Sequence, residues 1–313
     1  MTTQQTAPTL YLPTTTPTGP STIAYRRLGT LPPSPALPTL VVLTHFRGVQ
    51  DKLDPLLLNR LAAHRPVLTL DLPGVGLSTG LPATTVAAAA DQTLAFLAAL
   101  GLATIDLLGF SLGGMVAQLV ALNADPSALR VRRLILAGTA PSAGEGVLAA
   151  PEAAVVATAG ASQHVELETF KVLFFPRTEE GEAAAEGWWG RIHERSAETN
   201  GGEAVGTWLS QDFADGAEGL KAHGNQVGTW AARETTRGRD GSFDRLGELG
   251  VPVLVANGHR DVQDDFMVPT YNSWVLQQRL PNAQLIVYPK SGHGFLFQYA
   301  ELFAKHAVMF LEG

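Results

Sequence analysis

The sequence predicts an α/β protein in which helices cover a mostly parallel sheet, because β-like and helix-like segments alternate along most of the chain. Short apolar runs typical of buried strands occur at 41–45, 67–71, 104–108, 133–137, 253–256 and 284–288. An Ala-rich stretch at 82–100 lies between two of these runs and stops before Gly101, a common kind of helix end. Alternation of this kind is typical of parallel strands joined by helices.

The chain is predicted to begin with a flexible segment and to end with a helix. The first 20 residues are rich in Thr and Pro and are predicted to form a flexible leader, with no apolar run long enough for a signal peptide. A strand is expected at 23–28, followed by a Pro-rich connection at 31–38. The chain is expected to end in a helix at 299–311.

Residues 141–243 interrupt the alternation and are predicted to form a helical lid domain, which leaves 21–140 and 244–313 as the α/β core. The stretch holds four of the five tryptophans and no tyrosine. Aromatic side chains without a phenol suit the roof of an apolar pocket, although packing between lid helices explains each one taken alone. The pocket candidates are Phe46, Phe110, Trp188, Trp189, Trp208 and Phe213.

The most informative motif has the form G-x-S-x-G and is centred on Ser111. The strand predicted at 104–108 precedes it, and a helix-like pattern follows it. A serine on such a sharp strand-to-helix turn has a strained backbone, so the residues two positions away must be glycine to avoid clashes. Gly109 and Gly113 occupy these positions. The motif therefore predicts a nucleophilic serine.

A serine hydroxyl is a poor nucleophile near neutral pH, so this hypothesis needs a histidine base and a carboxylate that orients it. His293 lies in a loop between Gly292 and Gly294 and is the predicted base. Asp261 follows the strand at 253–256 and is the predicted acid. The chain order serine, aspartate, histidine is the order that the strand-turn-helix serine motif leads us to expect.

These pieces resemble the α/β-hydrolase superfamily, and within it the cofactor-free esterase and haloperoxidase-like branch. The resemblance covers nearly everything after residue 20 and implies an eight-stranded, mostly parallel sheet, a lid after the sixth strand, and no cofactor. It also implies an aspartate shortly before a Met-Val-Pro or similar turn. Alignment from the preceding strand selects Asp261, whereas alignment back from Met267 selects Asp265 as the alternative acid.

The chain departs from the resemblance at the expected oxyanion loop. Family members commonly carry His-Gly where this chain has His45 and Phe46. Because an oxyanion donor is a backbone N–H, the substitution is compatible with an oxyanion hole. We assign Arg47 and Leu112 as the two donors, with Phe46 as the alternative to Arg47.

Composition limits the classes of partner. The chain has a net charge of −7 and no Lys/Arg run, so neither nucleic acid nor an anionic membrane is an expected partner. It has no cysteine, which excludes disulfides and thiolate metal sites. No second histidine stands at ligand spacing from His259, so no metal is expected. We expect a cytoplasmic enzyme that binds a hydrophobic small molecule, and the sequence leaves its oligomeric state open.

The predicted reaction is hydrolysis of a carboxylic ester or lactone through an acyl-enzyme on Ser111. A serine at this position disfavours dehalogenase and epoxide hydrolase chemistry, which need a carboxylate nucleophile. Carbon–carbon bond hydrolysis and cofactor-free haloperoxidase or perhydrolase activity are alternatives on the same triad. A non-catalytic protein that binds a small molecule is the alternative of a different class.

Overall fold

The computed structural model describes residues 1–34, 36–149, 160–259 and 267–313. Within these ranges the chain forms one eight-stranded sheet with the strand order β1-β2-β4-β3-β5-β6-β7-β8. The strands are β1 (Leu10–Thr16), β2 (Gly19–Leu28), β3 (Thr39–Leu43), β4 (Val67–Leu70), β5 (Thr104–Phe110), β6 (Arg130–Ala137), β7 (Val253–Gly258) and β8 (Ala283–Tyr288). β2 pairs antiparallel with β1 and β4, and the other pairings are parallel. The prediction of a mostly parallel eight-stranded sheet is confirmed.

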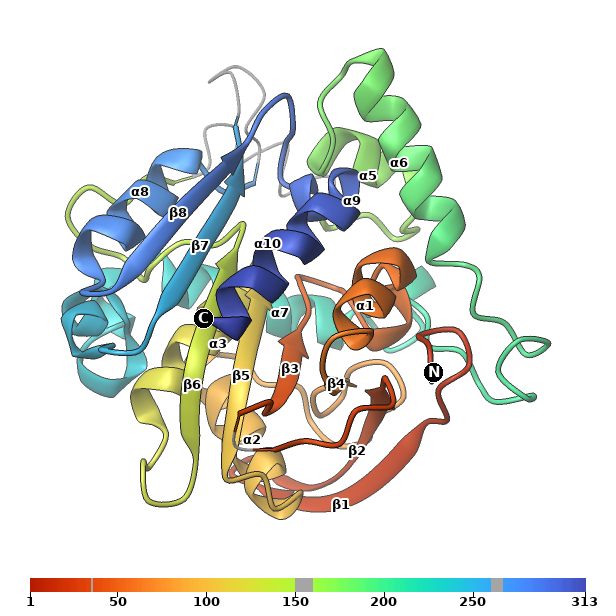
Figure 1. The fold of residues 1–313 in the computed structure, drawn as a ribbon, viewed down its shortest axis with the longest axis horizontal. Helices are drawn as coiled ribbons and strands as arrows, with labels where there is room; N and C mark the ends of the chain where they lie inside the picture. The colour runs from red at the N-terminus through yellow and green to blue at the C-terminus, as the bar shows by residue number, and fades with distance from the viewer. Residues whose placement is uncertain (35, 150–159, 260–266) are drawn as a thin grey trace.

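Helices cover both faces of this sheet (Figure 1). α1 (Pro55–Ala62) and α10 (Ala300–Glu312) pack together on one face. α2 (Val86–Ala99), α3 (Leu112–Asn123) and α8 (Thr270–Arg279) contribute to a separate apolar core on the other face. None of the helices in the described ranges is long and apolar enough to cross a bilayer.

The boundaries of α2 show how local sequence sets a helix. The hydroxyl of Thr85 accepts a hydrogen bond from the Ala88 N–H, which satisfies one of the free donors at the helix start. Gly101, which follows the helix, has φ +73°, a conformation that favours glycine and turns the chain toward β5. The predicted helix at 82–100 is therefore present, four residues shorter at its N-terminal end.

The prediction of a flexible leader over residues 1–20 is wrong. Residues 10–16 form β1, which pairs along its whole length with β2. The N–H of Gln4 donates to the side chain of Asn59, so the chain before β1 is also held against α1. Pro13 is compatible with this strand because an edge strand needs partners on one side only. β-Branched threonines favour extended structure, and this signal outweighs the prolines.

A long inserted segment separates β6 from β7; the structure describes its residues 138–149 and 160–252. The described part contains the helices α5 (Leu167–Leu173), α6 (Glu179–Arg191) and α7 (Glu218–Trp230), with short 3-10 helices at Gln211–Phe213, Arg233–Thr235, Gly238–Asp240 and Phe243–Glu248. In Figure 1, α5 and α6 lie above the upper ends of β3 and β5. The segment thus reaches the sheet edge where β3 and β5 end.

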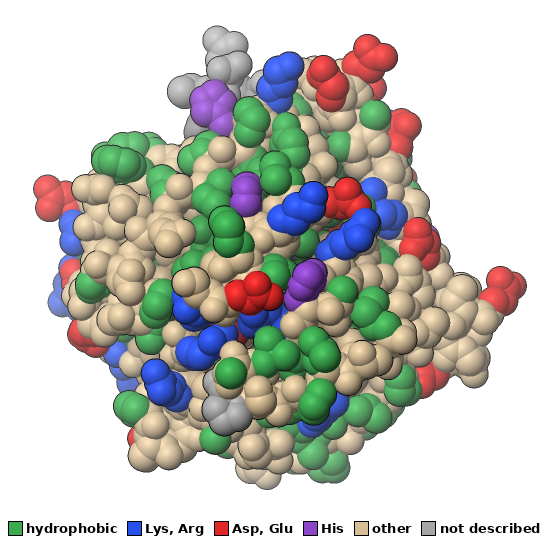
Figure 2. All heavy atoms as spheres, viewed as in Figure 1, with side chains coloured by type: hydrophobic (Ala, Val, Ile, Leu, Met, Phe, Trp, Pro, Cys, Tyr) green, Lys and Arg blue, Asp and Glu red, His purple; other side chains and the backbone are tan. Residues whose placement is uncertain are grey.

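The face over α1 and α10 has a mixed charge. Figure 2 shows basic and acidic side chains interspersed on this face, with no large area of one sign. A shallow hollow between the two helices is lined by both signs, among them Arg60, Lys305 and Glu301. Arg60 and Glu301 form an exposed ion pair across it.

Candidate active site

Ser111 lies at the sharp turn between β5 and α3. Its backbone has φ 56° and ψ −120°, a strained conformation for a residue with a side chain. A Cβ atom at Gly109 would lie 2.6 Å from the Cα of Gly114. A Cβ atom at Gly113 would overlap the carbonyl oxygens of Leu43 and Thr44. The turn is therefore compatible only with glycine two positions before and two positions after Ser111, as in the G-x-S-x-G motif.

His293 faces Ser111 from the loop that follows β8. Its Nε2 atom lies 2.9 Å from Oγ of Ser111, within hydrogen-bond distance. Both side chains are buried, with 1% of His293 and 5% of Ser111 exposed. The loop is fixed by the Gly294 N–H, which donates to the carbonyl of Phe174 in the inserted segment at 2.7 Å. The structure thus brings the two residues of the predicted nucleophile and base together.

Asp261 and Asp265, the two candidates for the acid, lie outside the described residues. The structure describes the chain up to the point where it enters this loop. β7 ends at Gly258, and the N–H of the next residue, His259, donates to the carbonyl of Tyr288 at the end of β8. The acid loop therefore starts beside the strand that leads to His293. His259 itself is exposed.

The N-terminus of α3 provides one expected oxyanion donor. Leu112 is the first residue of this helix, so its N–H has no partner within the helix. The helix dipole adds a partial positive charge at the same place. Because Leu112 directly follows Ser111, this donor is close to the nucleophile.

The other expected donor, Arg47, is engaged elsewhere. A turn closes residues 45–48 through the Gly48 N–H, which donates to the carbonyl of His45 at 2.9 Å. The N–H of Arg47 donates to Nδ1 of His223 on α7 at 3.1 Å, so it is occupied in this structure. The N–H of Phe46, the alternative donor, makes no hydrogen bond to the described part of the chain. This geometry favours Phe46 over Arg47 as the donor opposite Leu112.

This arrangement of strand, serine turn and facing histidine can be compared with known proteins. The family model for the α/β-hydrolase fold matches residues 43–299, which is most of the chain. The chain belongs to the α/β-hydrolase fold family.

Two relatives of this hydrolase align over nearly the whole chain. A pimeloyl-(acyl-carrier protein) methyl ester esterase of Neisseria meningitidis serogroup B is 29% identical over 277 residues, which cover 87% of the hydrolase and 93% of the esterase. The structure of an α/β-hydrolase fold protein from Chitinophaga pinensis is 31% identical, with 99% of each chain covered and a TM-score of 0.78.

An esterase from a Rhodococcus species shares the fold at 22% identity, with a TM-score of 0.66 and 97% of this chain and 98% of that chain covered. The family and the esterase-named relative from Neisseria support the assignment of the chain as a carboxylic ester hydrolase.

His45 has a structural role in this hydrolase. Burial lowers the pKa of His45 to about 4, so the ring is neutral near pH 7. Its Nδ1 lies 2.9 Å from the carbonyl of Phe46, which can only accept, so Nδ1 carries the proton. The side chain therefore holds the turn that presents the Phe46 N–H.

Aromatic side chains pack around His293. The rings of Phe110 and Phe174 lie 5.0 and 5.2 Å from the His293 ring. Phe110 was a predicted pocket residue, whereas Phe174 was not among the pocket candidates. Phe174 directly follows α5, and its contact with the histidine loop exists only in the folded chain. Apolar side chains from both the core and the inserted segment thus lie next to the His293 ring.

The other predicted pocket residues lie at varying depth. Trp188 is fully buried and stacks on Phe297, with 5.2 Å between ring centroids. Trp189 and Trp208 stack on each other at 6.3 Å in the same aromatic cluster. Phe213 is 36% exposed, and Phe46 packs against the His223 ring at 5.7 Å. The structure therefore places the tryptophans in a packed cluster and Phe213 at the surface.

Proposed function

We propose that this hydrolase cleaves a carboxylic ester or lactone of a hydrophobic small molecule through an acyl-enzyme on Ser111. The contact of 2.9 Å between His293 Nε2 and Ser111 Oγ carries the proposal. It supports proton transfer from the hydroxyl to the imidazole as the oxygen attacks a carbonyl. The strained serine turn supports it further, because it directs the hydroxyl out of the sheet.

The proposed reaction has two halves. Ser111 Oγ bonds to the ester carbonyl carbon while His293 takes the hydroxyl proton, and the oxyanion forms next to the N–H groups of Leu112 and Phe46. The tetrahedral intermediate then breaks the bond to the alcohol oxygen, which takes the proton from His293. A water molecule repeats the sequence on the acyl-enzyme and releases the acid. In this scheme Asp261, or alternatively Asp265, orients the imidazole.

The surroundings of His293 support an apolar substrate. Phe110 and Phe174 flank the imidazole, and the inserted segment that carries Phe174 is proposed to act as the lid. A ring of aromatic carbon offers dispersion contacts to an acyl chain and few polar partners. The Neisseria relative is named for a methyl ester, so methyl esters of apolar acids belong in a substrate screen.

Labelling with a fluorophosphonate tests the nucleophile. We expect a covalent adduct on the Ser111 peptide by mass spectrometry and none on Ser111→Ala, because the reagent phosphonylates an activated serine. Hydrolysis of p-nitrophenyl esters of increasing acyl length, of methyl esters and of lactones then defines the substrate. A wild-type protein that neither labels nor hydrolyses any of these compounds contradicts the proposal.

The same assay identifies the acid. Asp261→Asn and Asp265→Asn are compared, and we expect kcat to fall by about 10⁴ in the variant that lacks the true partner of His293. The other variant serves as the control for a charge change in the same loop. Full activity in both variants contradicts the proposed position of the acid.

A further inference from the structure

Arg47, in the turn after β3, makes six hydrogen bonds with the inserted segment. Its guanidinium donates to the carbonyls of Leu209, Gly160, Ser162 and Ser210 at 2.8, 3.2, 2.6 and 2.9 Å. Its own carbonyl accepts from the Leu209 N–H at 3.0 Å, and its N–H donates to His223 Nδ1 at 3.1 Å. These six hydrogen bonds, here called the Arg47 clasp, join one core residue to three separate parts of the inserted segment.

The backbone of Arg47 depends on this clasp. Its φ of 60° lies in the left-handed region, where a residue with a side chain costs about 1 kcal/mol or more. Only 4% of the residue is exposed, and burial lowers the pKa of its guanidinium while the Asp215 carboxylate opposes that effect. A buried charge and a strained turn persist only where the surroundings hold them. The six hydrogen bonds supply that support.

The contacts form a closed path back to the turn. Ser210, whose carbonyl accepts from Arg47, donates its hydroxyl to Asp215 at 2.8 Å. Asp215 in turn accepts from the Gly219 N–H in the first turn of α7 at 2.9 Å. α7 carries His223, which accepts the Arg47 N–H. The guanidinium of Arg47 therefore binds the segment that leads into α7, and its backbone N–H binds α7 itself.

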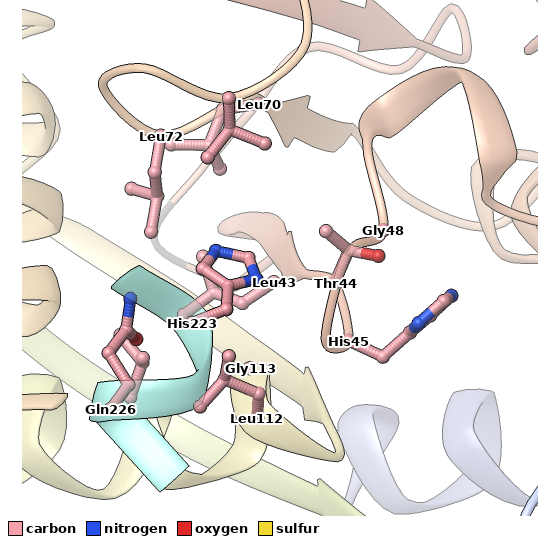
Figure 3. A pocket seen from close by; sticks show the side chains of 12 residues that line it. Leu43, Thr44, His45, Gly48, Leu70, Leu72, Leu112, Gly113, His223 and Gln226 are labelled. Atoms are coloured by element: carbon pink, nitrogen blue, oxygen red, sulfur yellow. The ribbon is translucent and has the colours of Figure 1, made fainter. Parts of the chain in front are cut away.

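Figure 3 shows the side chain of His223 entering from α7 toward the loop of Thr44 and Gly48, while His45 points away from it. The ring borders a small cavity of about 30 Å³ that also touches Leu112 and Gly113. His223 therefore lies behind the turn that presents the Phe46 N–H, on the side opposite the aromatic cluster. Within the described residues, His223 makes no hydrogen bond to Ser111 or to His293.

We propose that His223 is a positioning residue that acts through the Arg47 clasp. The geometry of the oxyanion donors then depends on how the inserted segment packs against the turn after β3. This inference rests on the proposed function of Ser111. By occupying the Arg47 N–H, His223 fixes the peptide plane between Phe46 and Arg47. The orientation of the turn then leaves the Phe46 N–H for the oxyanion. A segment displaced from the core loses the clasp, and the turn loses the bonds that hold its strained residue.

His223 is suited to accept a hydrogen bond at any working pH. Burial lowers the pKa of His223 to about 3, and the positive charge of Arg47 acts in the same direction. The ring is therefore neutral, with Nδ1 free to accept, and the histidine is required here for its acceptor and not for titration. An amide oxygen at the same distance from the backbone serves equally well.

The matched variants His223→Asn and His223→Leu test the inference. Both lose the ring, but Asn keeps an acceptor at the position of Nδ1, and Leu places a methyl group there. We expect kcat for a p-nitrophenyl ester to fall about 10- to 100-fold in His223→Leu, because a small misplacement of a catalytic group has costs of this size. KM and the pH profile are expected to stay within about threefold and 0.3 pH units of wild type.

His223→Asn is expected to retain kcat within about threefold of wild type, because its acceptor replaces Nδ1. Gln226→Leu is the control for a polar residue removed from the same face of α7. Its amide donates to the carbonyl of Ala83 and has no bond to the turn. We expect Gln226→Leu to lower the melting temperature without changing kcat.

Several outcomes overturn the inference. They are an unchanged kcat in folded His223→Leu, or an equal loss in His223→Asn and His223→Leu. If His223→Leu does not fold, Arg47→Lys carries the test, because Lys keeps the charge but cannot bridge four carbonyls. An unchanged kcat in Arg47→Lys then contradicts the clasp. A wild-type protein without esterase activity or fluorophosphonate labelling contradicts the proposed function instead, so the two failures are distinguishable.

Discussion

Nε2 of His293 and Oγ of Ser111 lie 2.9 Å apart, although 182 positions separate the two residues in the sequence. Ser111 is placed by the end of β5 and His293 by the loop after β8, with β6 and β7 between these strands in the sheet. Parallel strands end at the same edge of a sheet, so the histidine loop can return over the two intervening strands. The contact between Ser111 and His293 is therefore a consequence of strand order.

Replacement of Ser111 by Gly and by Ala separates strain from catalysis. Both variants lack the proposed nucleophile, so we expect ester hydrolysis to fall by at least about 10⁴ in each. Gly adopts φ 56° without a steric cost, whereas Ala at this position still has the steric cost of its Cβ atom. We therefore expect Ser111→Gly to have a free energy of unfolding about 1 kcal/mol above that of Ser111→Ala in urea titrations. Equal stability of the two variants contradicts strain at this turn.

Gly113→Ala tests the close approach of α3 to the end of β3. The new methyl group overlaps the carbonyls of Leu43 and Thr44, so we expect a loss of about 1 to 3 kcal/mol in the free energy of unfolding and a lower kcat. Gly190→Ala on α6 is the matched control, because its methyl group meets no atom within 4 Å. There we expect a gain of about 0.5 to 1 kcal/mol from helix propensity. Thermal unfolding measures both effects. A melting temperature that shifts in the same direction in both variants, relative to wild type, contradicts the prediction.

Asp106 is predicted to be a major source of stability in the sheet. It is buried on β5 and accepts from Arg65 at 2.7 Å and from Arg132 at 2.6 Å. Asp106→Asn leaves the buried Arg65 guanidinium without a counter-charge, so we expect a loss of about 3 kcal/mol in urea unfolding. Asp91→Asn removes the partner of exposed Arg239 and is expected to cost less than about 1 kcal/mol. Comparable losses in both variants are inconsistent with a dominant effect of burial.

Asp71 is predicted to make stability depend on pH. Burial raises the pKa of Asp71 from 3.8 to about 6, against the opposing effect of hydrogen bonds from the N–H groups of Gln50 and Leu77. A carboxyl group with a raised folded-state pKa contributes most to stability below pH 3.8, and this contribution is lost as pH rises through about 6. The shift corresponds to roughly 3 kcal/mol when complete.

Urea unfolding of wild type and Asp71→Asn between pH 4 and pH 7 measures this contribution. We expect the stability of wild type relative to Asp71→Asn to fall by about 2 kcal/mol over that interval, because Asn does not titrate. A difference that stays constant, or that grows with pH, shows that the carboxyl group is not destabilised by burial.

Local patterns predicted most of the core elements. The apolar runs at 67–71 and 253–256 and the Ala-rich run at 82–100 correspond to β4, β7 and α2, because burial on both faces and helix propensity leave a signal in adjacent residues. β1 was missed, since an edge strand is exposed on one side and needs no continuous apolar run. The serine motif could be recognised because its residues are adjacent in the sequence: Gly109 is required by atoms of the same turn, whereas Gly113 is required by the carbonyls of Leu43 and Thr44.

His223 shows what local reasoning lacks. The buried residues of its helix lie on one face: Gly219, Ala222, His223, Gln226 and Trp230. This helical spacing in the sequence indicates that His223 is buried. The partner of that residue is the backbone N–H of Arg47, 176 positions away, and no pattern in either segment specifies it. Similarly, the sequence favoured the Arg47 N–H as an oxyanion donor, and only the fold shows that this group is already bonded.

The sequence by itself indicated most of the strands, the helices α2, α3 and α10, the serine turn and His293 as the candidate base, because each leaves a pattern within a few adjacent residues. The tertiary structure decided which side chains meet. Strand order brought Ser111 to His293, and the packing of the inserted segment against the turn after β3 determined which backbone amides remain free. Hydrogen bonds between distant segments depend on their positions in space, and folding alone sets those positions.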